Sequence, residues 1–333
     1  MNILFRTSGG INTKRELGFG HIYRCINLSS YFKRNKIFFL VEDNGGVKSI
    51  FRERKIPRVS YLESAELNSD IKSTRESIIK NKIDVLIVDV YGLSLEYLVE
   101  IRKNTKVVVI SDLMSIDFPA DLVINGFIGF KNKIRQNRLG VKCVLGPAYQ
   151  ILDKNFRKKI NVKKKYDLLI TFGGYDDNSI TEIALSLLLK YPNLTTKVIL
   201  GPATKMSKKI KNLEKDLGDR VKIIKQTRRM NFEMAQCRFG LCSGGLTTYE
   251  FASMHIPFAV ISQVKHQLIT ANSWEKMGLA KNLGLFNKQI KKRIDEYLRE
   301  ISEIPKSSTN YSKLFHQSNG INTIIREISK INN

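Results

Sequence analysis

The side chain best suited to proton transfer is that of His21. It follows two glycines in the segment Gly18-Phe19-Gly20-His21-Ile22-Tyr23-Arg24. Glycine lets a ligand approach the backbone closely, and free N–H groups at the start of a helix favour a negative charge. An unperturbed imidazole titrates near pH ~6.5 and can therefore give or take a proton at neutral pH. His21 is accordingly a candidate general acid or base. A capping or packing histidine is the alternative, and position alone leaves both open.

A second glycine-rich segment, Phe172-Gly173-Gly174-Tyr175-Asp176-Asp177-Asn178, occupies the equivalent place in the second half of the chain. We expect backbone donors of Gly173 and Gly174 to cradle a diphosphate. One of the polar residues at 176–178 is expected to cap the helix that follows. An ordinary tight turn is the competing interpretation of this segment.

The third and most specific segment is Cys242-Ser243-Gly244-Gly245-Leu246-Thr247-Thr248-Tyr249-Glu250, again a strand, a loop of small residues and a helix. Ser243 and Thr247 can donate hydrogen bonds to phosphate oxygens. Backbone N–H groups at the amino end of the predicted helix can bind the same anion. They belong to Gly244, Gly245 and Leu246.

Glu250 lies three to four residues into that predicted helix. There we expect it to face the ligand, where a carboxylate can accept two hydrogen bonds from the vicinal hydroxyls of a ribose. The alternative is a capping box in which Glu250 is the partner of Thr247.

The segment Val264-Lys265-His266-Gln267-Leu268-Ile269-Thr270-Ala271-Asn272 also follows a predicted strand and opens a helix. It presents an imidazole and two amide groups, from His266, Gln267 and Asn272, that can form hydrogen bonds with a sugar. A helix that simply starts with polar residues is the alternative.

The elements that must position these side chains follow an α/β pattern. Short β-branched runs alternate with longer amphipathic segments, which predicts parallel sheets built from βαβ units. A helix is expected over 21–33. The expected strands span 2–6, 36–41, 84–88, 106–111, 122–125, 143–145, 167–172, 197–200, 221–224, 239–242 and 258–261.

Gly146-Pro147 and the lysine-rich stretch after it interrupt this alternation. The pattern predicts two doubly wound domains, 1–148 and 149–333, with the C-terminal helices packing back on the first. The first would hold the catalytic histidine and the second the nucleotide. Ligands of such sheets bind at the carboxyl ends of the strands, so we expect the site in a central cleft between the domains.

The composition is that of an ordinary globular protein, which we expect to be soluble. Apolar residues make up 42% of the 333 residues, and no run approaches the roughly 20 apolar residues of a membrane span. The start of the chain has no signal-peptide pattern, so we expect a cytoplasmic protein. The four cysteines are scattered and expected to be reduced, and the four histidines form no metal-binding cluster.

The formal net charge of +25 is spread over many predicted helices. We interpret it as a solvated basic surface, with weak attraction to an anionic membrane as the alternative. No aromatic-basic motif of an RNA-binding module is present, so nucleic acid is not an expected partner.

Further short motifs stand between and around these segments. In chain order the set is Phe5-Arg6, Gly18-Phe19-Gly20-His21-Ile22-x-Arg24, Asp89-x-Tyr91-Gly92, Asp112, Asp121-Leu122-x-Ile124-Asn125, Phe172-Gly173-Gly174, and Ser243-Gly244-Gly245 through Glu250. Taken together, these motifs resemble the pseudaminic-acid-pathway UDP-sugar hydrolases, the UDP-2,4-diacetamido-2,4,6-trideoxy-beta-L-altropyranose hydrolases. They appear in family order across nearly the whole chain. The second half more loosely resembles the UDP-N-acetylglucosamine transferase of lipid II synthesis.

The resemblance implies a GT-B fold of two Rossmann-like domains, with UDP bound mainly by the second. It implies hydrolysis at the anomeric carbon of a UDP-linked diacetamido-trideoxy sugar, which releases UDP and free sugar for nonulosonic acid biosynthesis. The histidine matching His21 would activate water, and the tyrosine matching Tyr91 would lie beside the sugar. Gly18, Gly20 and Arg24 would contact the substrate. Neither a metal nor a cofactor is implied, and we expect a monomer.

Two departures from the family pattern bear on substrate and reaction. Extra residues at 9–15 precede Gly18, and His266-Gln267 stands where the hydrolases commonly have Asn-Gln. The pair His266-Gln267 is similar to the corresponding residues of the transferases. A GT-B glycosyltransferase is therefore the first alternative, and a non-catalytic protein that binds a sugar nucleotide or nucleic acid is the second.

Overall fold

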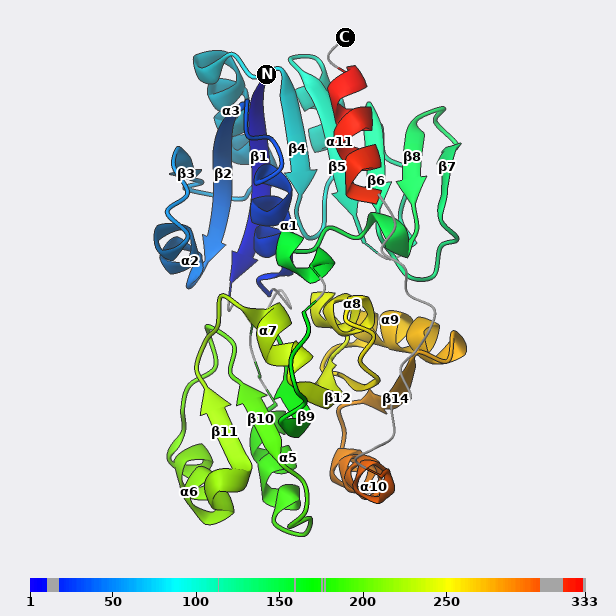
Figure 1. The fold of residues 1–333 in the computed structure, drawn as a ribbon. Helices are drawn as coiled ribbons and strands as arrows, with labels where there is room; N and C mark the ends of the chain where they lie inside the picture. Colours follow the sequence, from blue (N-terminus) through cyan, green and yellow to red (C-terminus); the bar gives the residue numbers. More distant parts are fainter. Residues whose placement is uncertain are drawn as a thin grey trace. The chain divides into compact units, whose positions relative to one another are not determined.

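The computed structural model describes residues 1–10, 18–112, 114–158, 160–174, 176, 178–305 and 320–331. It separates into two compact units, drawn in Figure 1. Met1–Asp153 and Gln317–Asn333 form the first unit, and Lys154–His316 forms the second. The second unit thus begins at Lys154 rather than at residue 149, and the last helix belongs to the first unit.

Within the described residues, the first unit is built on an eight-stranded sheet with the order β3-β2-β1-β4-β5-β6-β8-β7. Every pairing is parallel except that of β7 with β8. Residues 4–10 of β1 are all buried, as expected of a central strand covered on both faces. The strands are β1 (Asn2–Gly10), β2 (Lys36–Asn44), β3 (Val59–Tyr61), β4 (Val85–Asp89), β5 (Lys106–Ser111), β6 (Leu122–Asn125), β7 (Lys133–Gln136) and β8 (Lys142–Leu145).

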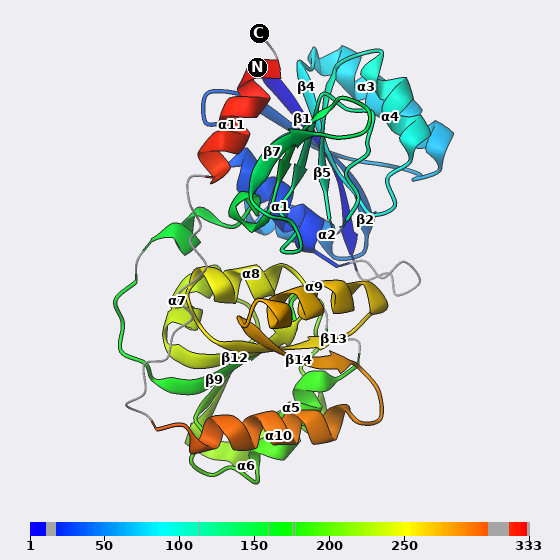
Figure 2. The ribbon, with the colours of Figure 1, turned by 90° about the vertical axis from the view of Figure 1, so that its right-hand side faces the viewer.

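Helices cover both faces of this sheet. Figure 2 shows α3 (Leu67–Asn81) and α4 (Leu95–Arg102) on one face, with α1 (Gly20–Ser29) and α11 (Gly320–Ile331) on the other. Helix α2 (Val47–Glu53) packs on β2, where Phe51 meets Phe39 edge to face. Each helix buries an apolar stripe at helical spacing, as α1 does with Ile22, Cys25 and Ile26.

The second unit contains a six-stranded, fully parallel sheet with the order β11-β10-β9-β12-β13-β14. Figure 2 shows α5, α6 and α10 on one face of it and α7, α8 and α9 on the other. Its strands are β9 (Tyr166–Thr171), β10 (Thr196–Ile199), β11 (Val221–Ile224), β12 (Cys237–Ser243), β13 (Phe258–Ser262) and β14 (Ala280–Leu285). Its helices are α5 (Ile180–Leu188), α6 (Lys208–Leu217), α7 (Met230–Ala235), α8 (Leu246–Ser253), α9 (Lys265–Lys276) and α10 (Ile290–Glu303).

Both sheets reverse their strand order at one place, between β1 and β4 in the first and between β9 and β12 in the second. Ligands of doubly wound sheets bind at the carboxyl ends of the strands beside such a reversal. The three glycine-rich segments follow β1, β9 and β12, and each therefore lies at one of these two places.

The predicted α/β class and every predicted strand are confirmed, whereas the strands β3, β7 and β14 were not predicted. The helix expected over 21–33 ends earlier, at Ser29. Among the described residues, none of the helices combines the length and the apolar character that crossing a bilayer requires.

Candidate active site

In the first unit, the strand reversal brings His21 and Asp89 together. Thr7 of β1 lies opposite Asp89, which is the last residue of β4. Helix α1 starts within the glycine-rich segment, at Gly20, and carries His21 in its first turn. The cap residue of α1 is Phe19, so His21 does not cap the helix. Its side chain is 19% exposed, which leaves part of the imidazole accessible to a ligand.

The His21 ring is oriented by a carboxylate. Nδ1 of His21 lies 2.6 Å from Oδ1 of Asp89, whose side chain is fully buried. Nη2 of Arg24 lies 3.0 Å from the same nitrogen, but a guanidinium can only donate. The shorter contact to the carboxylate favours an Nδ1–H that donates to Asp89. Nε2 then keeps its lone pair, as a general base requires.

Arg24 holds two carboxylates in place. Its Nε donates to Oδ2 of Asp89 at 2.7 Å and its Nη2 to Oδ1 at 2.6 Å. Nη2 also donates to Oδ2 of Asp112 at 3.0 Å, and Nη1 donates to Oδ1 of Asp112. Arg24 is 5% exposed, and these bonds use most of its five N–H groups. The guanidinium therefore contacts side chains of the protein, where the sequence predicted a contact with substrate.

The charges of this cluster shift one another. Burial and the Arg24 charge lower the pKa of His21, but the Asp89 and Asp112 carboxylates together outweigh them, so the pKa is raised overall. Burial raises the pKa of Asp89, but Arg24 and His21 reverse this and bring it down to about 2. Partial desolvation opposes ionisation of the half-exposed Asp112 carboxylate, but Arg24 lowers its pKa below the ordinary value. Both carboxylates are therefore ionised at neutral pH.

The other residues predicted for this edge lie in the loops around the cluster. Tyr91 lies in the turn after β4 and is 52% exposed. Gly20 is exposed at the start of α1, and the carbonyl of Gly18 accepts from the N–H of Gly10 at 3.2 Å. Gly10 has a φ of 143°, and a Cβ there would lie 2.4 Å from the Asn44 carbonyl carbon. The other extra residues of the 9–15 segment, 11–15, lie outside the described residues.

In the second unit, a hydrogen-bonded loop follows β9. Oγ of Ser243, at the end of β12, donates to the carbonyl of Phe172 at 3.2 Å, and Nε2 of Gln263 donates to it at 3.4 Å. Ser243 therefore braces the glycine loop, and its single hydroxyl proton is used there, where the sequence predicted donation to phosphate. Gly173 has a φ of 75°, which glycine adopts without strain. A Cβ on Gly201 would lie 2.0 Å from the Gly173 carbonyl oxygen.

Asp176, which follows the two glycines of this loop, caps the start of helix α5. The Asp176 carboxylate accepts from the N–H groups of Ile180 and Thr181, at 2.9 and 2.8 Å, at the start of α5. The predicted helix capping by this polar run is confirmed for Asp176. Tyr175 and Asp177 lie outside the described residues.

Helix α8 begins beside the same loop, with Gly245 as its cap residue. The first N–H groups of a helix have no partner within it, so those of Leu246 and Thr247 can bind an anion. A Cβ on Gly244 would lie 2.8 Å from the Gln267 carbonyl oxygen, so glycine allows this close approach. Glu250 lies in α8 and is partly buried. Because Thr247 is inside the helix, the alternative of a capping box with Glu250 is wrong.

The polar residues of α9 have partners of their own. Oε1 of Gln267 accepts from the Gln263 N–H at 2.9 Å and so holds the end of β13. Oδ1 of Asn272, which is exposed, accepts from Nδ2 of Asn282 at 2.6 Å. His266 is partly buried in the first turn of α9. The predicted sugar contacts of these three residues stay predictions.

Sequence reasoning gave no role to Asp89 or Asp112, although both stood in the motifs of the resemblance. A signal was available, because a buried apolar run such as 85–88 that ends in a carboxylate places that charge at the carboxyl edge of the sheet. The pairing of these carboxylates with Arg24 could not be predicted from the sequence, since Arg24 and Asp89 are 65 positions apart.

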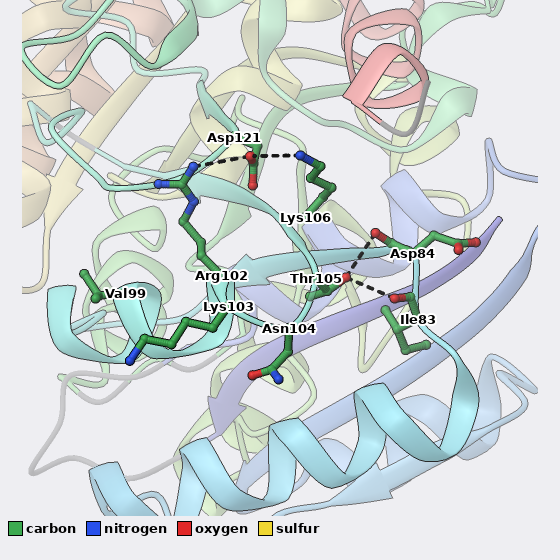
Figure 3. Close-up of a pocket in the computed structure, with 9 residues that line it drawn as sticks. All are labelled: Ile83, Asp84, Val99, Arg102, Lys103, Asn104, Thr105, Lys106 and Asp121. Atoms are coloured by element: carbon green, nitrogen blue, oxygen red, sulfur yellow. Dashed lines mark hydrogen bonds and ion pairs between the residues drawn. The ribbon is translucent and has the colours of Figure 1, made fainter.

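A cavity of about 580 Å³ lies at the amino ends of the strands of the first sheet, before the starts of β4, β5 and β6. In Figure 3, Asp121 pairs with both Arg102 and Lys106, and Oγ1 of Thr105 donates to the carbonyls of Ile83 and Asp84. Arg102 and Lys106 thus share one carboxylate of the protein. The candidate active site is the carboxyl edge, where His21 lies.

Two Rossmann-like units with sites at their strand reversals define the class of the protein, which has the GT-B fold. Similar solved structures bear this out. MurG of Acinetobacter baumannii aligns with a TM-score of 0.64 at 11% identity, covering 99% of this chain and 100% of that one. The UDP-GlcNAc 2-epimerase of Neisseria meningitidis, solved with UDP-GlcNAc, also gives 0.64, at 13% identity and with the same coverage.

Sequence relatives narrow the resemblance. The chain is 25% identical over 286 residues to the UDP-2,4-diacetamido-2,4,6-trideoxy-beta-L-altropyranose hydrolase of Campylobacter jejuni, covering 84% of this chain and 97% of the relative. The resemblance to these hydrolases is thereby confirmed. The spore coat polysaccharide biosynthesis protein SpsG of Bacillus subtilis is 27% identical, with 81% of each chain covered.

An uncharacterized protein of Methanocaldococcus jannaschii is also 27% identical, over 281 residues. That match covers 79% of this chain but spans only 56% of the archaeal protein. No protein-family model matches the chain.

Proposed function

We propose that this protein is an enzyme that processes a UDP-sugar, and that it hydrolyses a UDP-linked diacetamido-trideoxy hexose at the anomeric carbon. The observation that carries the proposal is the 2.6 Å contact between Nδ1 of His21 and Oδ1 of Asp89. It supports an Nδ1–H that donates to the carboxylate, so that Nε2 of the unprotonated imidazole can take a proton from water. The named hydrolase among the relatives supports the substrate class.

In this proposal the second unit binds UDP. The glycine loop after β9 and the first N–H groups of α8 bind the diphosphate, because both present backbone donors to an anion. Glu250 accepts hydrogen bonds from the ribose hydroxyls. His266, Gln267 and Asn272 bind the sugar.

The reaction then needs one proton transfer and one displacement. Nε2 of His21 takes a proton from water while the water oxygen forms a bond to the anomeric carbon. The bond from that carbon to the phosphate oxygen breaks, and its electron pair leaves with UDP. The proton on His21 returns to solvent. UDP is a good leaving group, so positioning the water and stabilising the diphosphate are the main demands on the site, and no metal is required.

The free sugar released would serve nonulosonic acid biosynthesis of the pseudaminic type. Tyr91, in the turn two residues after Asp89, is proposed to lie beside the sugar ring. The proposal further includes a cytoplasmic monomer that a membrane attracts only weakly.

The test is UDP release in the absence of any acceptor. UDP-linked diacetamido-trideoxy hexoses and UDP-N-acetylglucosamine are supplied separately, and the sugar product is followed by NMR. Release of free sugar is expected only from the diacetamido-trideoxy substrates. We expect His21→Asn to reduce kcat by about 10²- to 10⁴-fold, because a general base contributes that much. His255→Asn is the matched control, since asparagine tolerates the left-handed φ of 54° at this position.

A glycosyltransferase is the second candidate, favoured by the likeness of His266-Gln267 to the transferases. UDP binding without turnover until an acceptor alcohol is added would replace the hydrolase proposal with this one. A His21→Asn variant with the wild-type rate would remove His21 from the mechanism.

A further inference from the structure

Four side chains form what we call the His21 cluster, namely His21, Arg24, Asp89 and Asp112. Their charges can be counted because each is held by named contacts. While the imidazole is neutral, two carboxylates face one guanidinium and the cluster carries a net charge of minus one. When His21 takes a proton, the net charge becomes zero. The cluster is therefore balanced in the state that the reaction creates.

Asp112 decides whether the cluster is neutral when His21 is protonated. Without it, Asp89 would be the one carboxylate facing both the Arg24 guanidinium and the imidazolium, and the cluster would carry a net charge of plus one. Isolated charges are costly in such surroundings. Asp112 follows β5 directly, and its Oδ2 lies 3.9 Å from Nδ1 of His21. That is close enough for an opposite charge to favour the imidazolium.

Arg24 fixes where the Asp112 charge is. The guanidinium binds both oxygens of Asp112 through Nη1 and Nη2, although the Asp112 side chain is 48% exposed. A two-point contact of this kind restrains the carboxylate more than a single bond. Among the described residues, Cys25 of α1 is a further titratable neighbour, and its thiol lies 3.8 Å from Oδ2 of Asp89. Burial raises the pKa of this thiol well above its ordinary value, so Cys25 stays neutral.

We propose that Asp112 is a positioning residue whose charge, held on Arg24, stabilises the imidazolium that forms when His21 takes a proton from water. The inference rests on the proposed function only in naming water as the source of that proton. Asp112 acts through the cluster, so it should govern the titration of His21 and leave substrate binding unaffected.

The test replaces Asp112 with asparagine, which keeps an oxygen to accept from Arg24 and removes the charge. The imidazole C–H signal of His21, assigned by its loss in His21→Asn, is titrated by NMR. We expect its midpoint, and the acid limb of the kcat/KM profile, to move to lower pH by about one pH unit. We expect kcat above that limb to fall up to about tenfold with KM unchanged, because a less basic imidazole is a weaker general base.

Two further variants make the result specific. Asp112→Glu restores the charge and should return the His21 titration toward that of the wild type. Asp117→Asn removes an exposed carboxylate that pairs with Arg138, and it should leave the titration unchanged. An unchanged His21 midpoint in folded Asp112→Asn would overturn the inference.

The NMR titration requires no turnover, so the two proposals fail separately. A shifted midpoint in a protein that hydrolyses no UDP-sugar refutes the proposed function and leaves the charge balance standing. Hydrolysis with an unshifted midpoint refutes the charge balance alone.

Discussion

Replacing Asp89 with asparagine tests whether the buried carboxylate stabilises the fold through its charge. Asp89 is fully buried, receives two hydrogen bonds from Arg24 and faces Nδ1 of His21. The asparagine side chain has nearly the same shape, so the substitution changes the charge and one hydrogen-bonding atom while creating no cavity. The predicted loss of stability therefore comes from electrostatics.

The magnitude follows from the pKa of Asp89, which is lowered from 3.8 to about 2. A lowered carboxylate pKa contributes stability that is present above the pKa of the unfolded chain and is lost as the pH falls through the folded value. At about 1.4 kcal/mol per pH unit between the two values, the ionised carboxylate contributes about 2.5 kcal/mol at pH 5.5. The same relation leaves about 1.3 kcal/mol at pH 3.

The assay is urea denaturation of the wild type and Asp89→Asn at pH 5.5 and pH 3. The same comparison is made in the His21→Asn background, which removes the titration of His21, because loss of Asp89 would also lower the pKa of the folded imidazole. We expect the difference in the free energy of unfolding to narrow by about 1 kcal/mol between pH 5.5 and pH 3. Asp117→Asn, which changes an exposed residue, should stay within about 0.5 kcal/mol of the wild type.

A difference that is the same at both pH values would refute this reasoning, because the stabilisation would then not depend on ionisation of Asp89. A difference that widens toward pH 3 would mean that the folded state raises the pKa of this carboxyl.

Two predictions concern the second unit. Glu250→Ala should weaken UDP binding by about tenfold, because it removes hydrogen bonds from a charged acceptor to the ribose; calorimetry with UDP measures this, and the exposed Glu296→Ala is the control. Equal affinity in the wild type and Glu250→Ala would eliminate the ribose role. Gly201→Ala should lower the free energy of unfolding by about 1–3 kcal/mol, because the new Cβ would lie 2.0 Å from the Gly173 carbonyl oxygen and the loop must shift. Gly20→Ala, where a Cβ meets nothing within 4 Å, is the control in urea denaturation, and equal stability of the two variants would show that the close approach is absent.

The sequence predicted the parts of the fold whose local pattern is strong. Central strands such as β4 and β5 are β-branched runs buried on both faces, and their neighbouring helices carry apolar residues at helical spacing. The strands that were not predicted lack that pattern. All four residues of β7 are exposed at the sheet edge, β3 has three residues, and β14 contains lysine, asparagine and glycine.

The site was predictable to the level of its loops and no further. The glycine-rich segments and His21 indicated the loops where a ligand is expected to approach the backbone. The pairing of Ser243 with the Phe172 carbonyl, 71 positions away, and of Arg24 with two carboxylates depends on the order of the strands. Ser243 and Arg24 were therefore predicted as ligand contacts, although both side chains serve to hold other groups of the protein.

The position of α11 has a consequence for how the chain is made. The second unit is an insertion in the first, whose last helix is supplied by residues 320–331. Ile321, Ile324 and Ile328 of that helix are buried, and Glu327 accepts from Lys142 of β8 at 2.9 Å. During synthesis, residues 1–153 must therefore leave an apolar face of their sheet uncovered until α11 emerges, by which time the whole second unit has been translated. A fragment consisting of residues 1–153 alone would retain that exposed face. Residues 1–153 therefore do not form a complete folding unit without α11.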